Sequence, residues 1–448
     1  MMAYEYRRGR RSCLAVVSLA LILLLAAPTA AQDRPLTLDE AVKLALERNE
    51  RALATREDVL AAEARVAQAR SFFLPAITST STYTRRAYET RRIVGGSEVI
   101  IQRFNALSES IALSQTLFDA RSLTSLAAVR AQRNAQVAAA TESRRQLAFE
   151  VSQAFLATLG ASQVREASAR RFTFAGQNLE AAQARFAAGL ASVNDVTRAE
   201  LEYATAEVGL TQVQGQVETS TLQLAYLLDA PEAVRAALVV PEFLIEAASA
   251  EAADPEALVE EALARRLDVG SLRWLATSQR ALARLPMLGW LPSLSANGQY
   301  RLTNESSFNN RNWNWSLGAT LSWSIFDGGA RFSQQRERKA LARLADLDLQ
   351  AATRKVDVDV REALVLLANQ RASLRQATVA QEVAQKNAAE TAELYRQGLA
   401  SALEVADANV SLFEAEVALV QERYGLGTAF LNLEAALGLD PFGKEPRK

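Results

Sequence analysis

The chain repeats one sharp turn at two places, and this duplication limits its possible folds more than any other feature. The stretch RFAAGLASVNDV begins at Arg185, and LYRQGLASALEV begins at Leu394, 209 residues later. Both contain Gly-Leu-Ala-Ser, followed by an acidic residue and a long helical pattern. Glycine at the end of a helix adopts the left-handed conformation that closes a tight hairpin. The sequence therefore predicts, in each copy, a long helix, a turn and a helix that runs back.

Further matching segments extend the duplication over most of the chain. They are residues 38–42 with 254–258, 73–75 with 290–292, 117–119 with 325–327, and 222–224 with 431–433. Each copy is predicted to run from short helices through a proline, a β-like segment and Phe-Asp into the long helix and its turn. The predicted parts are a signal peptide (1–31), a first repeat (32–230), a linker (231–253), a second repeat (254–441) and a tail (442–448).

Two tracts without proline favour unusually long helices. No proline lies between Ala76 and Ala230 or between Ser293 and Asp440. A helix from Ala120 to about Ala188 would be roughly 100 Å long. Its returning partner is shorter, so we expect the helices near 36–70 and 254–285 to stack end to end and complete it. The second returning helix carries apolar residues at heptad spacing, which need a partner helix: Leu403, Ala406, Val410, Phe413, Val417, Val420 and Tyr424.

The segments between the proline and Phe-Asp have the period-2 pattern of strands. In the second copy (about 292–326), apolar residues from Trp313 to Ile325 alternate with Asn, Ser, Gly and Thr, and residues 294–302 repeat this more weakly. In the first copy (about 76–118), tracts 76–90 and 104–118 form the corresponding pair around Gly95-Gly96, with poorer alternation. A soluble β-sandwich remains an alternative. Trp313, Trp315 and Trp323 near the ends of the apolar face favour a membrane strand with interface aromatics.

Four strands cannot span a bilayer alone, because both sheet edges would leave backbone groups without hydrogen bonds in hydrocarbon. Several copies must therefore close one barrel. Two copies would make eight strands, whose side chains nearly fill the interior, and three would make twelve around water. A homotrimer is the smallest assembly consistent with polar inward faces.

Composition excludes most other functions. Histidine is absent and the only cysteine is Cys13, so imidazole and disulfide chemistry are ruled out. No nucleophile–base set, phosphate loop or metal cluster occurs, so we expect no enzyme activity, no cofactor and no metal. Residues 1–31 have a basic head, a short apolar stretch and small residues, as a secretory signal does, with a membrane anchor as the alternative. The remainder has 46 basic and 50 acidic residues, and this net charge of −4 gives no sign of nucleic-acid binding.

This organisation resembles the TolC family of outer-membrane efflux proteins, also called outer-membrane factors. The markers are Leu-Pro at Pro75 and Pro292, Phe-Asp at Asp119 and Asp327 (followed in the second case by Gly328-Gly329), and the two turns. The resemblance implies a mainly α protein with a membrane β part. A homotrimer would form a twelve-stranded outer-membrane barrel that continues into a long periplasmic α-helical barrel.

The resemblance also implies the function and the partners. The protein would be the exit duct of a tripartite efflux or type I secretion system, served by a periplasmic adaptor (membrane fusion) protein and an inner-membrane pump and surrounded by outer-membrane lipid. The tips would dock the adaptor at the periplasmic end through Gly189, Leu190, Ala191, Ser192, Gly398, Leu399, Ala400 and Ser401. A periplasmic coiled-coil or adaptor-like protein without a barrel is the alternative. The transported substrate cannot be inferred.

Four residues are assigned roles by the same resemblance. Glu404 and Asp407 match two acidic residues that line the narrow entrance in well-studied members. Tyr395 matches a tyrosine that bonds, in the closed state, to an acidic residue matched by Asp195. An arginine of that network corresponds to Ala400, which predicts a weaker lock. Arg85, Arg86, Arg91, Arg92 and Arg103 surround the first predicted loop, where they could meet lipopolysaccharide phosphates or be solvated or face the lumen.

Overall fold

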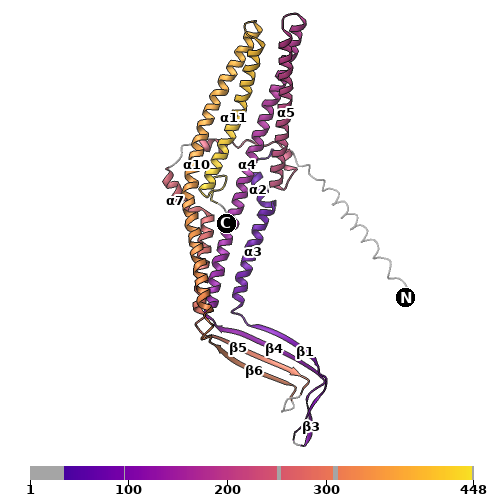
Figure 1. The fold of residues 1–448 in the computed structure, drawn as a ribbon, viewed down its shortest axis with the longest axis vertical. Helices are drawn as coiled ribbons and strands as arrows, with labels where there is room; N and C mark the ends of the chain where they lie inside the picture. The colour runs from indigo at the N-terminus through magenta and orange to yellow at the C-terminus, as the bar shows by residue number, and fades with distance from the viewer. Residues whose placement is uncertain (1–34, 95, 250–253, 306–310, 446–448) are drawn as a thin grey trace, which may run out of the picture.

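The molecule is a long column of helices with a small β-sheet at one end (Figure 1). A computed structural model describes residues 35–94, 96–249, 254–305 and 311–445. The predicted signal peptide lies outside the described residues. Within those ranges, no helix combines the length and the apolar character needed to cross a membrane.

The two repeats contain corresponding elements in the same order. The first comprises α2 (Leu38–Arg48), α3 (Glu50–Ser71), β1 (Ala76–Arg85), β2 (Thr90–Val94), β3 (Ser97–Gln102), β4 (Asn105–Phe118), α4 (Ala120–Ala187) and α5 (Val193–Leu228). A connecting region holds the 3₁₀ turn η1 (Ala233–Arg235) and α6 (Glu242–Ser249). The second comprises α7 (Pro255–Arg265), α8 (Leu267–Leu282), α9 (Leu285–Leu288), β5 (Ser293–Thr303), β6 (Trp313–Ser322), α10 (Ala330–Arg396) and α11 (Ala402–Ala436).

The long helices have the predicted extent. Helix α4 contains 68 residues and α10 contains 67, so each is about 100 Å long. Asp119 caps α4 by accepting a hydrogen bond from the backbone N–H of Arg121 at 2.9 Å. The absence of proline allows each helix to continue without a break until the glycine of the turn.

Shorter helices complete the column, as the sequence predicted. Helix α3 lies along the sheet-side half of α4, and α5 lies along its tip-side half (Figure 1). Helix α7 packs against α10, and α8 packs against both α4 and α10, with α4 as its main neighbour. Helix α11 accompanies α10 towards the tip. The heptad residues of α11 find their partner in α4. There, the ring of Tyr424 packs over Gly160, and the guanidinium of Arg171 lies 4.8 Å from the ring centre of Phe413.

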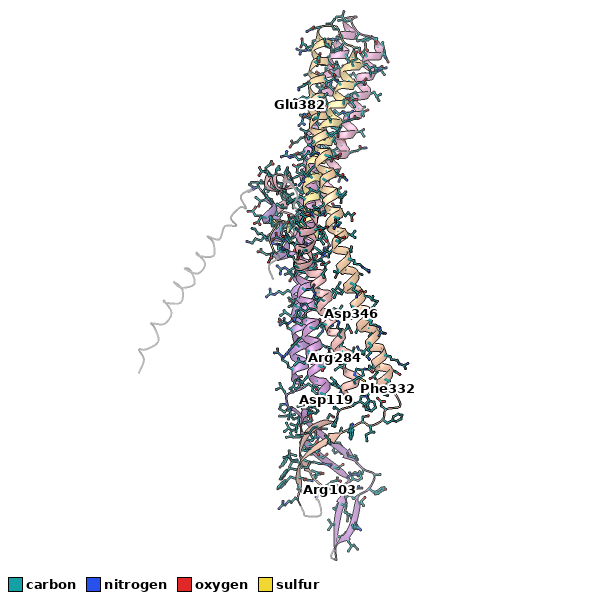
Figure 2. All side chains as sticks on the ribbon, turned by 90° about the vertical axis from the view of Figure 1, so that its left-hand side faces the viewer. Arg103, Asp119, Arg284, Phe332, Asp346 and Glu382 are labelled. Carbon is teal, nitrogen blue, oxygen red and sulfur yellow. The ribbon has the colours of Figure 1, made fainter. Side chains whose placement is uncertain are left out.

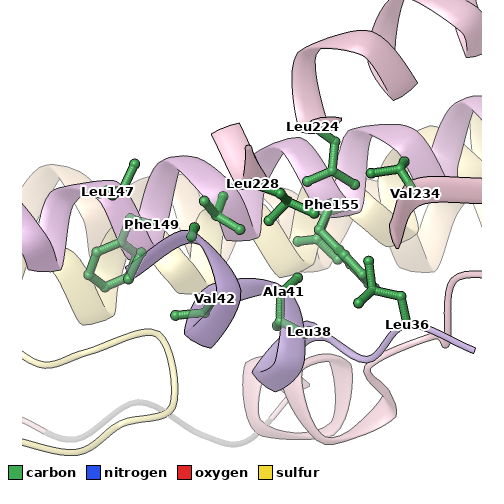
Figure 3. Close-up of a cluster of buried hydrophobic side chains, with 14 of the residues drawn as sticks. Leu36, Leu38, Ala41, Val42, Leu147, Phe149, Phe155, Leu224, Leu228 and Val234 are labelled. Carbon is green, nitrogen blue, oxygen red and sulfur yellow. The ribbon is translucent and has the colours of Figure 1, made fainter. Parts of the chain in front are cut away.

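The main core lies at mid-height, where α2, α4, α5 and α11 meet. Val42 of α2, Phe155 of α4 and Leu228 at the end of α5 belong to one cluster of buried apolar side chains (Figure 3). Phe155 and Leu228 are fully buried. Removing such side chains from water contributes about 1.5–3 kcal/mol each, so this cluster fixes α4 against α2, α5 and α11.

Four antiparallel strands form one sheet in the order β1-β4-β5-β6, and the β4–β5 pair joins the two repeats. Of the predicted tract 76–90, the strand β1 covers only Ala76–Arg85. Next to its end, the N–H of Arg86 still donates to the carbonyl of Phe104 opposite it, and the guanidinium of Arg86 binds Glu305. A separate hairpin, β2–β3, follows around the turn at Gly96.

The second strand region also ends earlier than expected. β6 stops at Ser322, and Trp323 and Ile325 lie beyond it. The indole N–H of Trp323 donates to the carbonyl of Trp290 at 3.0 Å, and the carbonyl of Ser324 accepts from Arg331 at 2.5 Å. These contacts turn the chain into α10.

Candidate functional site

The two hairpin tips have the same backbone construction. Gly189 and Gly398 have positive φ angles of +74° and +78°. The next N–H, of Leu190 or Leu399, donates to the carbonyl five residues earlier, of Arg185 or Leu394, at 2.8 Å. This is the Schellman arrangement that ends a helix at a left-handed residue. In both tips the leucine after the glycine is largely exposed, at 79% and 73%.

Each returning helix begins with a reciprocal capping box. Ser192 receives the N–H of Asp195, and the Asp195 carboxylate accepts the N–H and hydroxyl of Ser192 at 2.9 Å. Ser401 and Glu404 make the same three hydrogen bonds, and the N–H of Ser401 donates to the Glu404 carboxylate at 2.6 Å. These bonds hold the pKa of Asp195 and of Glu404 below their ordinary values. The hydrogen bond from the serine backbone N–H has the largest effect, followed by the one from the serine hydroxyl. Ala191 and Ala400 occupy the intervening position of each turn.

The repeat offset of 209 residues pairs the charged residues of the two tips. Asp195 corresponds to Glu404, and Arg198 corresponds to Asp407. The first tip therefore carries one charge of each sign, whereas the second carries two carboxylates three residues apart. Asp407 is exposed on α11, close to Glu404 on the helix surface.

The two residues of the expected closed-state lock, Tyr395 and Asp195, have other contacts in this structure. The Asp195 carboxylate is occupied by its own cap, and no hydrogen bond joins it to Tyr395 among the residues that the structure describes. Instead, the guanidinium of Arg185 lies over the Tyr395 ring, 4.1 Å from its centre. This cation–π contact links the two hairpins beside their tips. Sequence reasoning missed Arg185, although it opens the repeated motif.

The sheet has one apolar and one polar face. Strand pairing places Ile77, Leu113, Gly298 and Leu317 in one row, with Ser79, Ile111, Tyr300 and Trp315 in the row two positions further from the helices. The opposite face carries rows such as Thr80, Ser110, Arg301 and Asn314. Trp313 and Trp315 lie at the end of β6 far from the helices, and Trp323 lies just past its other end. All three are exposed, at 43%, 64% and 60%.

An aspartate–arginine pair marks each strand-to-helix junction. Asp119 accepts two hydrogen bonds from the guanidinium of Arg121, at 2.8 and 3.0 Å (Figure 2 shows Asp119 at this junction). In the second repeat, Arg331 binds Asp327 at 2.7 Å, donates to the carbonyls of Gly289 and Ser324, and lies over the Trp290 ring. The sequence contains the signal, since FDAR and FDGGAR differ only by Gly328-Gly329, but the arginines were not singled out.

Both the helical column and the four-stranded sheet have outer elements with a neighbour on one side only. Across the tip-side half the helices follow the order α10, α11, α4, α5, so α10 and α5 each have a neighbour on one side only (Figure 1). Their free sides carry apolar residues at multiples of seven. The edge stripe of α5 is Leu201, Val208 and Leu222, all more than half exposed. That of α10 is equally exposed: Val365 and Val379 lie on its tip-side half, and Leu344 and Val358 continue the stripe on the half nearer the sheet. In the sheet, β1 and β6 likewise have one partner each.

In the described ranges, no group of three or more acidic or cysteine side chains is placed to hold a metal ion. The groups that the site offers are the carboxylates at the tips, the apolar tips themselves and the apolar edges. Such an arrangement can bind other chains and influence ions.

Comparison with known proteins gives consistent matches. A family model described as outer membrane efflux protein matches residues 41–230 and 258–439, covering both repeats. The outer membrane protein TolC of Vibrio cholerae is 26% identical over 384 residues, which are 83% of this chain and 84% of that protein.

Solved structures share the fold. A membrane protein from Pseudomonas aeruginosa has a TM-score of 0.76 at 21% identity, covering 90% of this chain and 93% of that one. The Campylobacter jejuni CmeC outer membrane channel has a TM-score of 0.76 at 16% identity, covering 92% and 87%. The open state of the Neisseria gonorrhoeae MtrE outer membrane channel has a TM-score of 0.74 at 17% identity, covering 92% and 90%.

Proposed function

Because the chain belongs to the outer membrane efflux protein family, we propose that three copies of it assemble into one duct from the periplasm to the cell exterior. Its function as a member of that family is efflux, and its place is the outer membrane with an extension into the periplasm. A periplasmic coiled-coil protein without a barrel is not favoured, because the family match spans both repeats. The assembly, the partners and the residue roles below are our inference.

The observation that carries the proposal is the duplicated packing of the helices. Within one chain, the returning helix α11 of the second repeat packs against the outgoing helix α4 of the first. By the same rule, α5 should pack against an outgoing helix equivalent to α10. One chain has no such helix free on that side, so α10 of another copy is the natural neighbour. The edge stripes of α5 and α10 have the heptad spacing that such a contact requires.

The sheet leads to the same number of copies. β1 and β6 each leave one row of backbone N–H and C=O groups open, which is costly in lipid. Twelve strands from three copies close the sheet and enclose water. The polar face with Thr80, Ser110 and Asn314 would then line the lumen, and the apolar face would meet lipid.

The tryptophans fit the two membrane interfaces. The ten residue-to-residue steps from Trp313 to Trp323 would span about 33 Å in extended conformation, and a tilt of about 45° reduces this to about 23 Å of height. The apolar band of outer-membrane barrels is about 25 Å tall. Trp313 and Trp315 would therefore anchor one interface and Trp323 the other.

The tips would dock a periplasmic adaptor that connects the duct to an inner-membrane pump. Leu190 and Leu399 are largely exposed at the ends of the two hairpins, and three copies would present six such leucines in a ring. Apolar residues at the centre of a polar surface are typical of a protein–protein contact. The left-handed glycines fix the direction of each leucine.

The acidic residues of the second tip would line the entrance. Three copies would place Glu404 and Asp407 as six carboxylates around the opening. At the first tip, the positive charge of Arg198 offsets the negative charge of Asp195. The negative charge of the ring would therefore come from Glu404 and Asp407 on α11. We propose that Tyr395 and Asp195 approach each other in the closed duct, and that Arg185 holds Tyr395 in the state described above.

Two measurements test the proposal. The purified protein in mild detergent should have the mass of three mature chains; a monodisperse monomer that needs no detergent would contradict it. Gly189→Val and Gly398→Val should abolish export and leave the trimer in the membrane, because valine resists a φ near +75°. Ala187→Val, on ordinary helical backbone two residues earlier, is the matched control and should export normally. Normal export by both glycine variants would exclude the tips as the docking site.

A further inference from the structure

The apolar face of the sheet ends, away from the helices, in two arginines. Arg85 closes β1 and shares the face of Ile77 and Tyr83, since side chains alternate along a strand. Arg311 precedes β6 on the side of Trp313, whose ring it covers. Figure 2 shows this end of the molecule, with Arg103 labelled beside it.

Both guanidinium groups are held by an aromatic ring. The Arg85 Cζ lies 4.8 Å from the ring centre of Phe104, and the Arg311 Cζ lies 5.4 Å from that of Trp313. A guanidinium stacked on a ring keeps its N–H edge free to bind an oxyanion in its plane. The ring also limits the motion of the side chain, so less entropy is lost on binding.

Neither arginine forms an ion pair with a carboxylate among the described residues, in contrast to Arg86 and Arg91. Arg86 binds Glu305, and Arg91 binds Glu89 and Glu98 at 3.1 and 3.5 Å. The carboxylate that the four strands place on this face, Glu109, lies nearer the helices and accepts the hydroxyls of Ser79 and Ser81. The available positive charge on this face is therefore at its outer end.

The surrounding sequence is basic in a chain that is otherwise slightly acidic. Residues 83–108 and 300–313 contain seven arginines and three glutamates, whereas the whole chain has a net charge of −1. A local excess of arginine attracts anionic lipid head groups at a membrane surface.

We propose that Arg85 and Arg311 bind phosphate groups of lipopolysaccharide, the phosphorylated glycolipid of the outer leaflet. The inference rests on the proposed function, because that function turns the apolar face towards lipid and this end towards the exterior. Tyr83, Trp313 and Trp315 mark the interface, and the two guanidinium groups lie at its head-group side. Trp323 marks the opposite interface, next to the phospholipid leaflet, and the same face carries no arginine in the strands there.

The test is lipid binding by the purified trimer, followed by native mass spectrometry. Diphosphoryl lipid A is the probe, with its monophosphoryl form and phosphatidylglycerol compared at equal concentration. The Arg85→Gln/Arg311→Gln double variant should bind diphosphoryl lipid A about tenfold more weakly, since each charge-assisted hydrogen bond is worth a substantial fraction of that. The matched control is Arg301→Gln, at the same end of the sheet on the polar face, and should bind within about twofold of the wild type.

Further arms separate the possible sources of binding. Arg85→Lys/Arg311→Lys should retain part of the affinity, because lysine binds phosphate as a point charge without the planar fork. Diphosphoryl lipid A should bind more tightly than the monophosphoryl form and phosphatidylglycerol. Equal binding of phosphatidylglycerol, unchanged binding by the double variant, or an equal loss in Arg301→Gln would overturn the proposal.

The same spectra separate this inference from the assembly. A trimeric wild type whose lipid A count is unaffected by the double substitution contradicts only the lipid site. A wild type that is monomeric contradicts the proposed assembly, and the lipid A count per chain then decides the site.

Discussion

Leu222 and Leu431 occupy equivalent positions in the two repeats, yet their surroundings are opposite. Leu222 on α5 is 64% exposed, whereas Leu431 on α11 is fully buried in the core beside α4. The local sequences are alike, LQL in one and LNL in the other. The difference therefore arises from position in the helical layer: α11 has a helix on both sides and α5 has one on one side only.

In the outgoing helices the buried copy is the first one: α4 is enclosed, and its equivalent α10 is exposed. Phe149 and Leu156 on α4 are 6% and 1% exposed, while their equivalents on α10, Val358 and Val365, are 57% and 59% exposed. Each repeat thus has one buried and one open flank, and the open flanks are complementary. Under the proposed assembly, the exposed leucine and valines would be the contacts that another copy fills.

The largest effect should come from charging the open flank. Val208→Glu/Leu222→Glu places two carboxylates in an apolar contact, and burying a charge without a partner costs several kcal/mol in each of three interfaces. We expect the trimer to be lost, as measured by mass in detergent. Gln214→Glu, on the solvated side of the same helix, is the matched control and should stay trimeric. A double variant that remains trimeric would show that α5 is not at an interface.

A truncation of the buried equivalent should act on the fold and not on assembly. Leu431→Ala removes a fully buried side chain and should lower the free energy of unfolding by about 2–5 kcal/mol. Leu222→Ala should weaken the trimer and change the stability of the separated chain little. Thermal melting and subunit dissociation, measured on both variants, distinguish the two. Equal melting losses would mean that the repeats are packed alike.

The pH dependence of stability should depend on a residue that only the second repeat has. Glu434 is buried, and its first-repeat equivalent is Ala225. Burial, as the largest cause, and the nearby Asp440 together raise the pKa of Glu434 to about 7. The nearby Arg265 lowers this pKa, but by less. Between about pH 4.5 and 7 the unfolded chain has lost this proton and the folded chain retains it. Stability therefore falls as pH rises through this window, by about 3 kcal/mol per chain.

Glu434→Gln should remove this loss. The variant should melt at the higher temperature at pH 7.5, and the difference from the wild type should shrink towards pH 4.5. Glu414→Gln, at an exposed position of the same helix, is the control and should follow the wild type. Parallel melting curves for the wild type and Glu434→Gln across this range would contradict the burial argument.

The smallest effect concerns the charges at the two tips. Asp407→Asn should reduce cation preference and block by divalent ions a few-fold in single-channel recordings, and more than Glu404→Gln does. The Glu404 carboxylate is already engaged by Ser401, whereas Asp407 makes no such bond in the part of the chain described. Glutamine can still form the capping box, so the turn is preserved.

Salt and the first tip provide the controls for this prediction. The preference should weaken above about 0.1 M salt, where the Debye length is about 10 Å. Arg198→Gln leaves Asp195 unopposed, and it should increase cation preference. Wild-type block in an Asp407→Asn/Glu404→Gln double variant would mean that these carboxylates do not line the opening.

Features encoded by neighbouring residues could be predicted from the sequence. The duplication, the extent of α4 and the sharp turns depend on proline-free tracts and on glycine at a helix end. The heptad pattern of α11 predicted a partner helix without identifying α4. The alternation of β6 was clear enough to predict. Its end at Ser322 is accompanied by contacts of the next residues with Trp290 and Arg331, which the alternation does not encode.

The candidate site was less predictable, because it depends on competition between contacts. The resemblance paired Tyr395 with Asp195. In the structure the Asp195 carboxylate accepts hydrogen bonds from Ser192, and the guanidinium of Arg185 lies over the Tyr395 ring. Glu404 is likewise occupied by Ser401. The five arginines near the first loop looked equivalent in sequence, and only their contacts separate Arg85 from Arg86 and Arg91.

The sequence by itself determined the elements of this protein: two copies of strands, a long helix, a left-handed turn and a returning helix. These follow from backbone preferences and periodicity, which act over a few residues. Only the tertiary structure decided which copy of each element is enclosed and which is left at an edge. Leu222 and Leu431 differ for that reason, because burial depends on neighbours that the chain brings from hundreds of residues away or, at its open edges, does not contain.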